Sequence, residues 1–241
     1  MKSVSNSKIA RGPYGSRASF GFTLVEAIVV IAIVAMLAGI VIPSVSKVRT
    51  KSLLVQCASN QRQIGLALQL YANDNEGIYP PTTHSVSPFR LNESWLYELD
   101  EYFTDSIDTI RICPADPEER RQRILDRNST SYVLNDLVFD DVNYRFPRRI
   151  PNPAQTHILF ILSEDRTPNV TRDHIHGGEW TNWISALNDI EPDRHRTGNR
   201  SSDRTKGSAP YLFADGHVEI ISASDFKDKF AEGVNPAEVP L

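Results

Sequence analysis

The sequence predicts an α+β fold in which one long N-terminal helix, membrane-spanning at first and amphipathic further on, packs on a small head with an antiparallel sheet. Three observations predict this fold. A run of about 20 residues from Ala27 to Ser46, long enough to cross a bilayer, contains no charged side chain. A helical stripe of apolar residues follows the run. Near the carboxyl end, Asp215-Gly216 joins two further apolar segments.

The apolar run has the length and composition of a membrane-spanning helix. At about 1.5 Å per residue, about 20 residues cross a hydrocarbon core of roughly 30 Å. The run has no polar face and follows a basic leader, whereas the core helix of a soluble domain would lie within a longer core pattern. We therefore expect residues 22–46 to span the membrane and residues 1–21 to form a leader outside the fold.

The charges around the span predict its orientation. Residues 1–21 carry four basic and no acidic side chains, which places the leader in the cytoplasm and the carboxyl side of the span outside it. Lys47, Arg49 and Lys51 flank the other end of the span and reduce this asymmetry. The head is acidic. From Asp74 onward it has 18 basic and 29 acidic residues, so nucleic-acid binding through bulk electrostatics is not expected.

A carboxylate, Glu26, lies inside the apolar segment, four residues after Phe22. A charged side chain costs about 2.5–3.5 kcal/mol at the centre of a bilayer and less near an interface, so a charge retained there indicates a function. A secretory signal peptide would carry a small-residue cleavage site after its apolar region. No such site follows Val45. The segment therefore differs from a secretory signal and from a plain anchor.

The helix is predicted to continue outside the membrane over residues 47–73. Pro43 is expected to kink the helix without ending it, because lipid or neighbouring helices can accommodate the lost hydrogen bond. Turn residues from Asn73 to Gly77 then end the helix. Positions at steps of three and four mark one helical face. They are Leu54, Cys57, Gln61, Ile64, Leu68 and Tyr71.

Residues 74–241 are predicted to form the globular head that covers this stripe. The apolar segment 157–162 predicts a buried strand after a proline-rich connection. Residues 211–214 and 217–221 are predicted to pair as a hairpin. The Asp215-Gly216 pair between them favours a type I′ turn, which needs positive φ at both central residues.

The first residues of the span carry a resemblance to a known family. Gly21-Phe22-Thr23-Leu24-Val25-Glu26 followed by an apolar helix closely resembles the signature of type IV prepilins and type II secretion pseudopilins. In that family a membrane peptidase cuts after the glycine and methylates the new amino-terminal phenylalanine. The resemblance implies that Gly21 and Phe22 form the processing site, that Glu26 serves assembly, and that Pro43 matches a proline common in the family's membrane helix.

The same resemblance implies partners and a location. The partners would be a prepilin peptidase, membrane lipid, and other pilin or pseudopilin subunits bound through the N-terminal helix. The chain would cross the inner membrane once, with its amino end in the cytoplasm. The pilin-like head would lie in the periplasm, or on the cell surface after assembly.

The head resembles a narrower prepilin-type subfamily, labelled by a histidine about nine residues before an Asp-Gly pair. Here the nearest upstream candidate, His195, lies 20 positions before Asp215, and the polar stretch 196–206 between them looks like an inserted loop. The resemblance does not extend to residues 117–155. It is carried by four segments, which are Cys57–Gly65, Tyr71–Asp74, Cys113–Asp116 and Tyr211–Glu219.

No catalytic or metal-binding motif is present, so we expect no enzyme activity and no metal centre. The acidic and histidine residues of the head match no zinc, facial-triad, nucleophile-elbow or phosphate-loop spacing. They are Glu164, Asp165, His174, His176, His195, Asp215 and His217. Two oxygen-rich stretches, 73–76 and 189–193, offer the ligand type that calcium takes but lack the order of an EF-hand. Calcium binding stays open at this point.

The chain has two cysteines, Cys57 and Cys113, and we predict that they form a disulfide. Both lie on the exported side of the span, where disulfides persist. Cys57 is on the stripe that the head covers, and Cys113 is in a proline-containing turn of the head. A bond closing a loop of about 56 residues would stabilise the fold by roughly 4 kcal/mol in a chain-entropy estimate. The alternative is two buried free thiols.

Three functions in different classes remain open. The first is a structural subunit, either a pilin or a pseudopilin, that polymerises through its N-terminal helix. The second is a membrane-anchored protein whose head binds a ligand or a surface. The third is an anchored enzyme. Glu26 favours the first, because a plain anchor does not need a carboxylate in lipid.

Overall fold

The computed structural model describes residues 23–104 and 106–241, with the side chains of Pro43 and Ser44 left out. The predicted processing residues Gly21 and Phe22 lie outside the described residues. The chain divides into two compact units, Met1–Ser44 and Val45–Leu241.

Helix α1 runs from Leu24 to Asp74 and confirms the long N-terminal helix. In the part of the chain that the structure describes, it is the one helix long and apolar enough to cross a membrane. Helix α1 continues through Pro43, which lies next to the boundary between the two units. Because the units are not placed relative to each other, the kink at Pro43 stays a prediction. Large apolar side chains of the first unit are exposed, among them Leu24, Val25, Ile28, Ile31, Met36 and Leu37.

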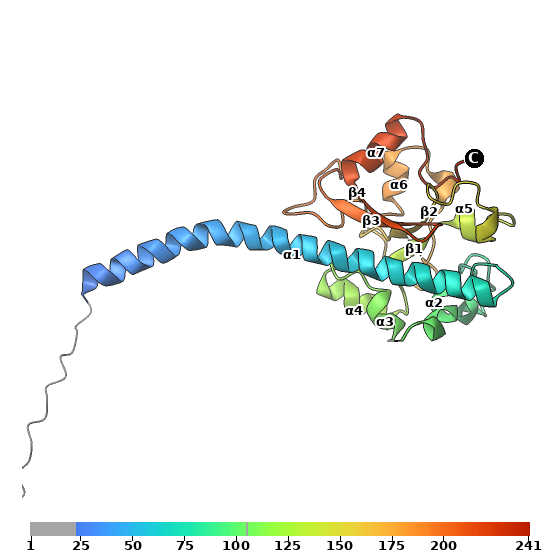
Figure 1. Cartoon of the computed structure of the whole chain (residues 1–241), viewed down its shortest axis with the longest axis horizontal. Coiled ribbons are helices and arrows are strands. Elements are labelled where there is room, and N and C mark those ends of the chain that lie inside the picture. Colours follow the sequence, from blue (N-terminus) through green and yellow to red (C-terminus); the bar gives the residue numbers. More distant parts are fainter. Residues whose placement is uncertain (1–22, 105) are drawn as a thin grey trace, which may run out of the picture. The chain divides into compact units, whose positions relative to one another are not determined.

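The second unit contains an antiparallel sheet of four strands in the order β1-β2-β3-β4 (Figure 1). The strands are β1 Tyr132–Leu134, β2 His157–Ile161, β3 Ser208–Phe213 and β4 Val218–Ser222. Every residue of β2 is buried, as predicted for the apolar segment there.

Six further α-helices lie in the described part of the head. They are α2 Trp95–Glu98, α3 Ile107–Ile110, α4 Glu118–Asp126, α5 Asp136–Phe139, α6 Trp183–Leu187 and α7 Ala223–Ala231. Four 3-10 turns accompany them, at Leu91–Glu93, Asp100–Tyr102, Pro147–Arg149 and Gly177–Glu179.

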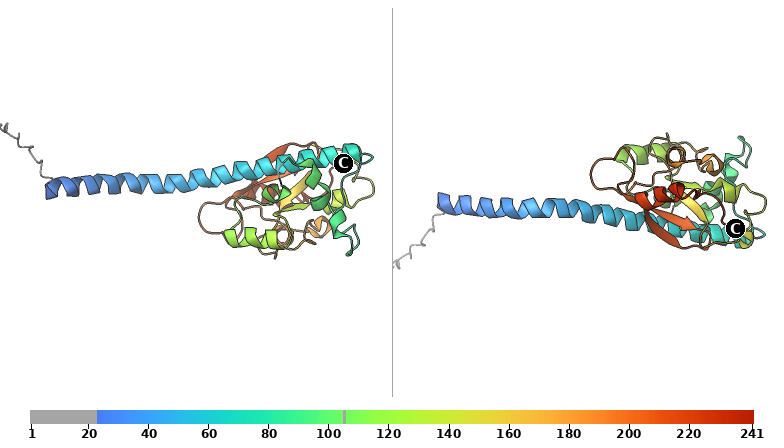
Figure 2. Two further views of the ribbon diagram at one scale, coloured as in Figure 1. Left: turned by 90° about the horizontal axis from the view of Figure 1, so that it is seen from below. Right: turned by 90° about the horizontal axis from the view of Figure 1, so that it is seen from above.

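Adjacent residues of β3 show that helices cover both faces of the sheet, since successive side chains of a strand point to opposite faces. On one face, a Cβ at Gly65 of α1 would lie 2.8 Å from Leu212, so the glycine lets helix and strand approach closely. On the other, the Tyr211 ring stacks on Phe226 of α7 with centroids 4.6 Å apart. Figure 2 shows these layers from below and from above.

The second half of α1 is the central element of the head. The predicted stripe is confirmed at its core, because Cys57, Gln61, Ile64 and Leu68 are all buried. The Gln61 side-chain amide also donates to the Pro210 carbonyl of β3 over 3.0 Å. This bond pairs the buried amide nitrogen of Gln61 and joins the helix to the sheet.

The predicted hairpin is confirmed, but its turn type is wrong. Gly216 has a φ of 92°, whereas Asp215 is not among the residues with positive φ. The Gly216 N–H donates to the Phe213 carbonyl over 2.9 Å, and the Phe213 N–H donates to the His217 carbonyl over 3.0 Å. The turn is therefore a three-residue loop that closes with a left-handed glycine, and only that glycine needs positive φ.

Candidate functional site

The first candidate site lies at the amino end of α1, where Thr23 and Glu26 cap each other. The Thr23 N–H donates to Glu26 Oε2 over 2.8 Å, and the Thr23 hydroxyl donates to the same oxygen over 2.7 Å. In return the Glu26 N–H donates to Thr23 Oγ1 over 3.2 Å. This is a capping box, in which the N-cap and N3 side chains satisfy each other's backbone N–H groups.

The capping box holds the Glu26 carboxylate on an exposed face of the helix. Both bonds from Thr23 reach the same carboxylate oxygen, and a carboxylate has about four acceptor positions. Glu26 can therefore cap its own helix and still accept from a second group. The Thr-x-x-Glu spacing is a recognised capping signal that the sequence analysis did not use.

The second candidate site lies inside the head, where Cys57 and Cys113 meet His195. The two Sγ atoms are 3.3 Å apart, and Nε2 of His195 lies 3.9 Å from Cys113 Sγ. The Tyr132 hydroxyl lies 3.3 Å from Cys57 Sγ. All four side chains are buried. Helix α1, the turn before α4, strand β1 and the segment before β3 each supply one of them.

The surroundings shift the pKa values of the two thiols in opposite directions. Burial raises the pKa of Cys57 well above its usual range, and contact with Cys113 raises it further. Burial acts in the same direction at Cys113, but hydrogen bonds with Cys57 and His195 outweigh it and lower the pKa of Cys113.

The cluster contains the donor types that zinc and other soft metal ions take. The ligand atoms of Cys57, Cys113 and His195 all lie within 4.8 Å of one another. Structural zinc sites use four protein ligands, and no fourth cysteine, histidine or carboxylate of the described residues joins these three. The cluster therefore lacks the closed ligand set of a structural zinc site. The sequence analysis missed it because His195 belongs to no metal motif.

The structure brings Cys57 and Cys113 together without bonding them, so the disulfide stays a prediction. We expect protein isolated without reductant and then denatured to take up no alkylating label, and to take up two labels after reduction. The Cys57→Ser variant is the control, because its remaining thiol should be labelled without reduction. Labelling of both cysteines in the unreduced wild type would rule the bond out.

In the second oxygen-rich stretch considered for calcium, residues 189–193, arginines pair with the carboxylates. The Asp189 carboxylate accepts from Arg166 over 2.6 Å. Glu191 and Asp193 pair with Arg204, with N–O distances of 2.6 Å and 2.7 Å. All three carboxylates are buried, where charges are stable only when they are compensated. The arginines supply the positive charge that a cation would otherwise bring.

A further ion pair lies deep in the same region. Arg194 Nη1 lies 3.1 Å from Asp116 Oδ1, and both residues are buried. The Arg194 guanidinium also donates to the Leu162 carbonyl over 3.2 Å. Burial lowers the pKa of Arg194, but Asp116 and Glu191 outweigh burial and raise it. The guanidinium is therefore charged and compensates Asp116 in the core.

The remaining residues considered in the sequence serve local contacts. His174 Nδ1 is 2.8 Å from the neighbouring Asp173 carboxylate. Asp215 accepts from the His217 N–H over 3.0 Å, as a turn residue does. Among the described residues, neither histidine belongs to a group of potential metal ligands.

Comparison with known proteins supports the reading of the amino end. Residues 16–42 match the family model described as the prokaryotic N-terminal methylation motif. The matched segment contains the predicted processing residues and Glu26, and it is consistent with a type IV prepilin-like protein. The match ends before the head, so the narrower subfamily is not confirmed. No curated protein and no solved structure matches the chain.

Proposed function

Because residues 16–42 carry the prokaryotic N-terminal methylation motif, we propose that the chain is a structural subunit, either a pilin or a pseudopilin. A prepilin peptidase would cut between Gly21 and Phe22 and methylate the new amine. The mature subunit would then enter a type IV pilus-like fibre or a type II secretion pseudopilus. The observation that carries the proposal is Glu26, an exposed carboxylate in an apolar helix.

The apolar surface of α1 supports assembly through this helix. Its large side chains between Leu24 and Ile42 have no cover from the described residues, so lipid surrounds them before assembly and neighbouring helices afterwards. Lipid tails are as apolar as these side chains, so apolar contact alone gives little preference for one register. A polar pairing is needed to select one arrangement of subunits.

Glu26 supplies such a pairing in our proposal. Cleavage leaves a protonated, methylated amine on Phe22, and the amine of a neighbouring subunit would meet this carboxylate. The pair would compensate both charges where an unpaired charge is costly, and one axial offset alone would bring the two groups together. The capping box supports this role, because it holds the carboxylate in place with one oxygen.

The proposal gives the head a structural role and assigns it no catalysis. The chain would cross the inner membrane once with its amino end in the cytoplasm, and its head would lie in the periplasm or on the cell surface. Shearing of intact cells without detergent tests the proposal. We expect the mature chain to appear in the sheared fraction as a polymer. If the fibre is a short pseudopilus, we expect the polymer there only after overexpression of the assembly system. A chain found only in the membrane fraction under both conditions would favour the anchored binding protein.

A further inference from the structure

The inserted loop at 196–206, to which the proposed function assigns no role, forms one wall of a pocket of about 510 Å³. The opposite wall is the part of α1 from Lys47 to Leu54. All lining residues belong to the second unit. In the part of the chain that the structure describes, no carboxylate lines this pocket. The pocket is therefore basic, on a head that is acidic as a whole.

The three arginines of the loop are not available to bind a ligand, because each already pairs with a buried or neighbouring carboxylate. Arg196 pairs with Glu164 over 3.0 Å. Arg200 pairs with Asp165 over 2.6 Å, and Arg204 pairs with buried acids on the segment before it. These pairs fix the course of the loop. They do not supply free positive charge to the pocket.

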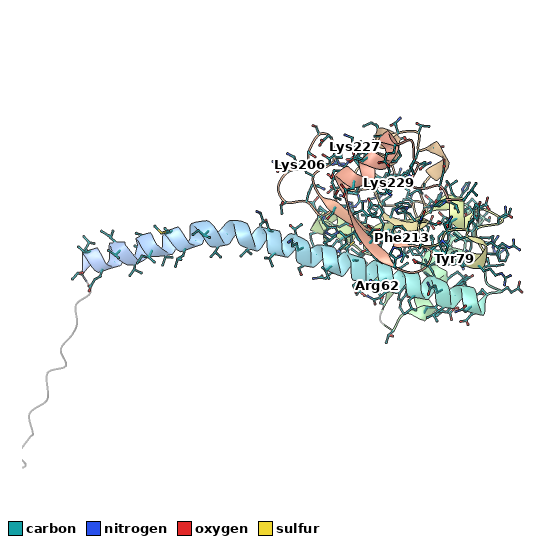
Figure 3. All side chains as sticks on the ribbon, turned by 45° about the horizontal axis from the view of Figure 1, so that its top comes forward. Arg62, Tyr79, Lys206, Phe213, Lys227 and Lys229 are labelled. Carbon is teal, nitrogen blue, oxygen red and sulfur yellow. The ribbon has the colours of Figure 1, made fainter. Side chains whose placement is uncertain are left out.

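The free positive charge of the pocket comes from three lysines, Lys47, Lys51 and Lys206. Among the described residues, no ion pair involves any of the three. Gly207 positions Lys206, because its φ of 148° suits glycine and a Cβ there would lie 2.9 Å from the Asp193 carbonyl. Figure 3 labels Lys206 on this loop.

A buried polar group also lines the pocket. The His195 side chain is 5% exposed, and its Nδ1 has no hydrogen-bond partner among the described residues. Buried ring nitrogens normally have a partner, so an unpaired one at a pocket wall indicates a ligand or water there. The other ring nitrogen faces Cys113. His195 thus connects the pocket to the cysteine pair.

The place of the lysines along the helix identifies the occupant. Lys47 directly follows the predicted end of the membrane span, and Lys51 is about 6 Å further along the helix axis. The headgroup layer extends roughly 5–8 Å beyond the hydrocarbon core, so both side chains lie at its depth. The groups that present negative charge at that depth are lipid phosphates.

We propose that this pocket binds the phosphate of an anionic phospholipid headgroup, held by Lys47, Lys51 and Lys206. The lipid seats the base of the head on the membrane while the rest of the acidic head is repelled from the anionic surface. The inserted loop supplies the wall of this site. The proposal rests on the membrane span and not on fibre assembly, so a chain that fails to assemble would leave it standing.

Lipid titration in native mass spectrometry tests the proposal on the full chain in neutral detergent. We expect the first phosphatidylglycerol to bind more tightly than phosphatidylcholine. Each of Lys51→Gln and Lys206→Gln should weaken phosphatidylglycerol binding about fivefold, and the double variant about 25-fold, at about 1 kcal/mol for each lysine. Phosphatidylcholine binding should not change in any variant.

The matched control is the Arg62→Gln/Lys227→Gln double variant, which removes the same charge from α1 and α7 outside the pocket (Figure 3). It should keep the wild-type affinity. Equal affinity of the wild type for both lipids would overturn the proposal, and so would equal losses in the two double variants. Inorganic phosphate is a separate arm. If it binds as tightly as phosphatidylglycerol, the site takes a free anion and the assignment to lipid is wrong.

Discussion

The Glu26→Gln variant is expected to be exported, cleaved and folded like the wild type, and to be nearly absent from the fibre. Glutamine at N3 still accepts from the Thr23 N–H, so the capping box survives the change. The substitution removes the charge that the neighbouring amine would meet. Loss of one partner of a desolvated ion pair costs about 3–5 kcal/mol, so incorporation should fall by at least about two orders of magnitude.

Thr23→Ala is the matched control for this prediction. It removes the cap, at a cost of about 1 kcal/mol to the helix end, and keeps the carboxylate. We expect it to assemble. Each variant should be co-expressed with the wild type, and the processed variant quantified in the sheared polymer and in the membrane. Normal incorporation of Glu26→Gln, or equal losses in both variants, would mean that the charge does not direct assembly.

The Arg194→Met variant is expected to destabilise the head by about 3–5 kcal/mol. Methionine fills part of the space but leaves Asp116 buried without its nearest guanidinium, which was 3.1 Å away. Arg120, 3.4 Å from the same carboxylate, then remains as its only guanidinium partner among the described residues. Breaking a buried ion pair is among the costliest single changes to a fold. Urea unfolding followed by tryptophan fluorescence measures the loss, because all three tryptophans, at 95, 180 and 183, lie in the head.

Two further variants separate charge from packing in this prediction. Arg121→Met removes an exposed pair with Glu118 on α4 and should change the free energy of unfolding by less than about 1 kcal/mol. The Asp116→Asn/Arg194→Met double variant should recover part of the loss, because the buried carboxylate is removed together with Arg194. Recovery stays incomplete because Arg120, 3.4 Å from the same carboxylate, also loses its charge partner. A double variant less stable than Arg194→Met alone would contradict this explanation.

The elements that could be predicted from the sequence are those with a strong local pattern. The long helix has one continuous stripe with Cys57, Ile64 and Leu68 on its buried face, and the strand at 157–161 is an uninterrupted apolar run. Helices α3 and α5 have four residues each. Elements that short form where tertiary packing places them, so the sequence pattern hardly distinguishes them from loops.

The candidate sites divide in the same way. Glu26 could be identified because its significance comes from its immediate neighbours, an apolar helix and a processing motif. The approach of Cys57 and Cys113 could also be predicted, whereas the place of His195 beside them could not, because 82 residues separate it from Cys113. The basic pocket could not be predicted from the sequence either, because its lysines come from a helix and from a loop far away in the sequence. The turn at Asp215 was assigned the wrong type because Asp-Gly also fits a three-residue loop.

The mass of the native protein tests the central claim most directly. If the chain is processed as a prepilin, the intact mass, measured after reduction, of protein isolated from cells that make a prepilin peptidase should match residues 22–241 plus one methyl group. Fragmentation should place that methyl group on the amine of Phe22. A native chain that still begins at Met1, or one cut at another position, would contradict the account.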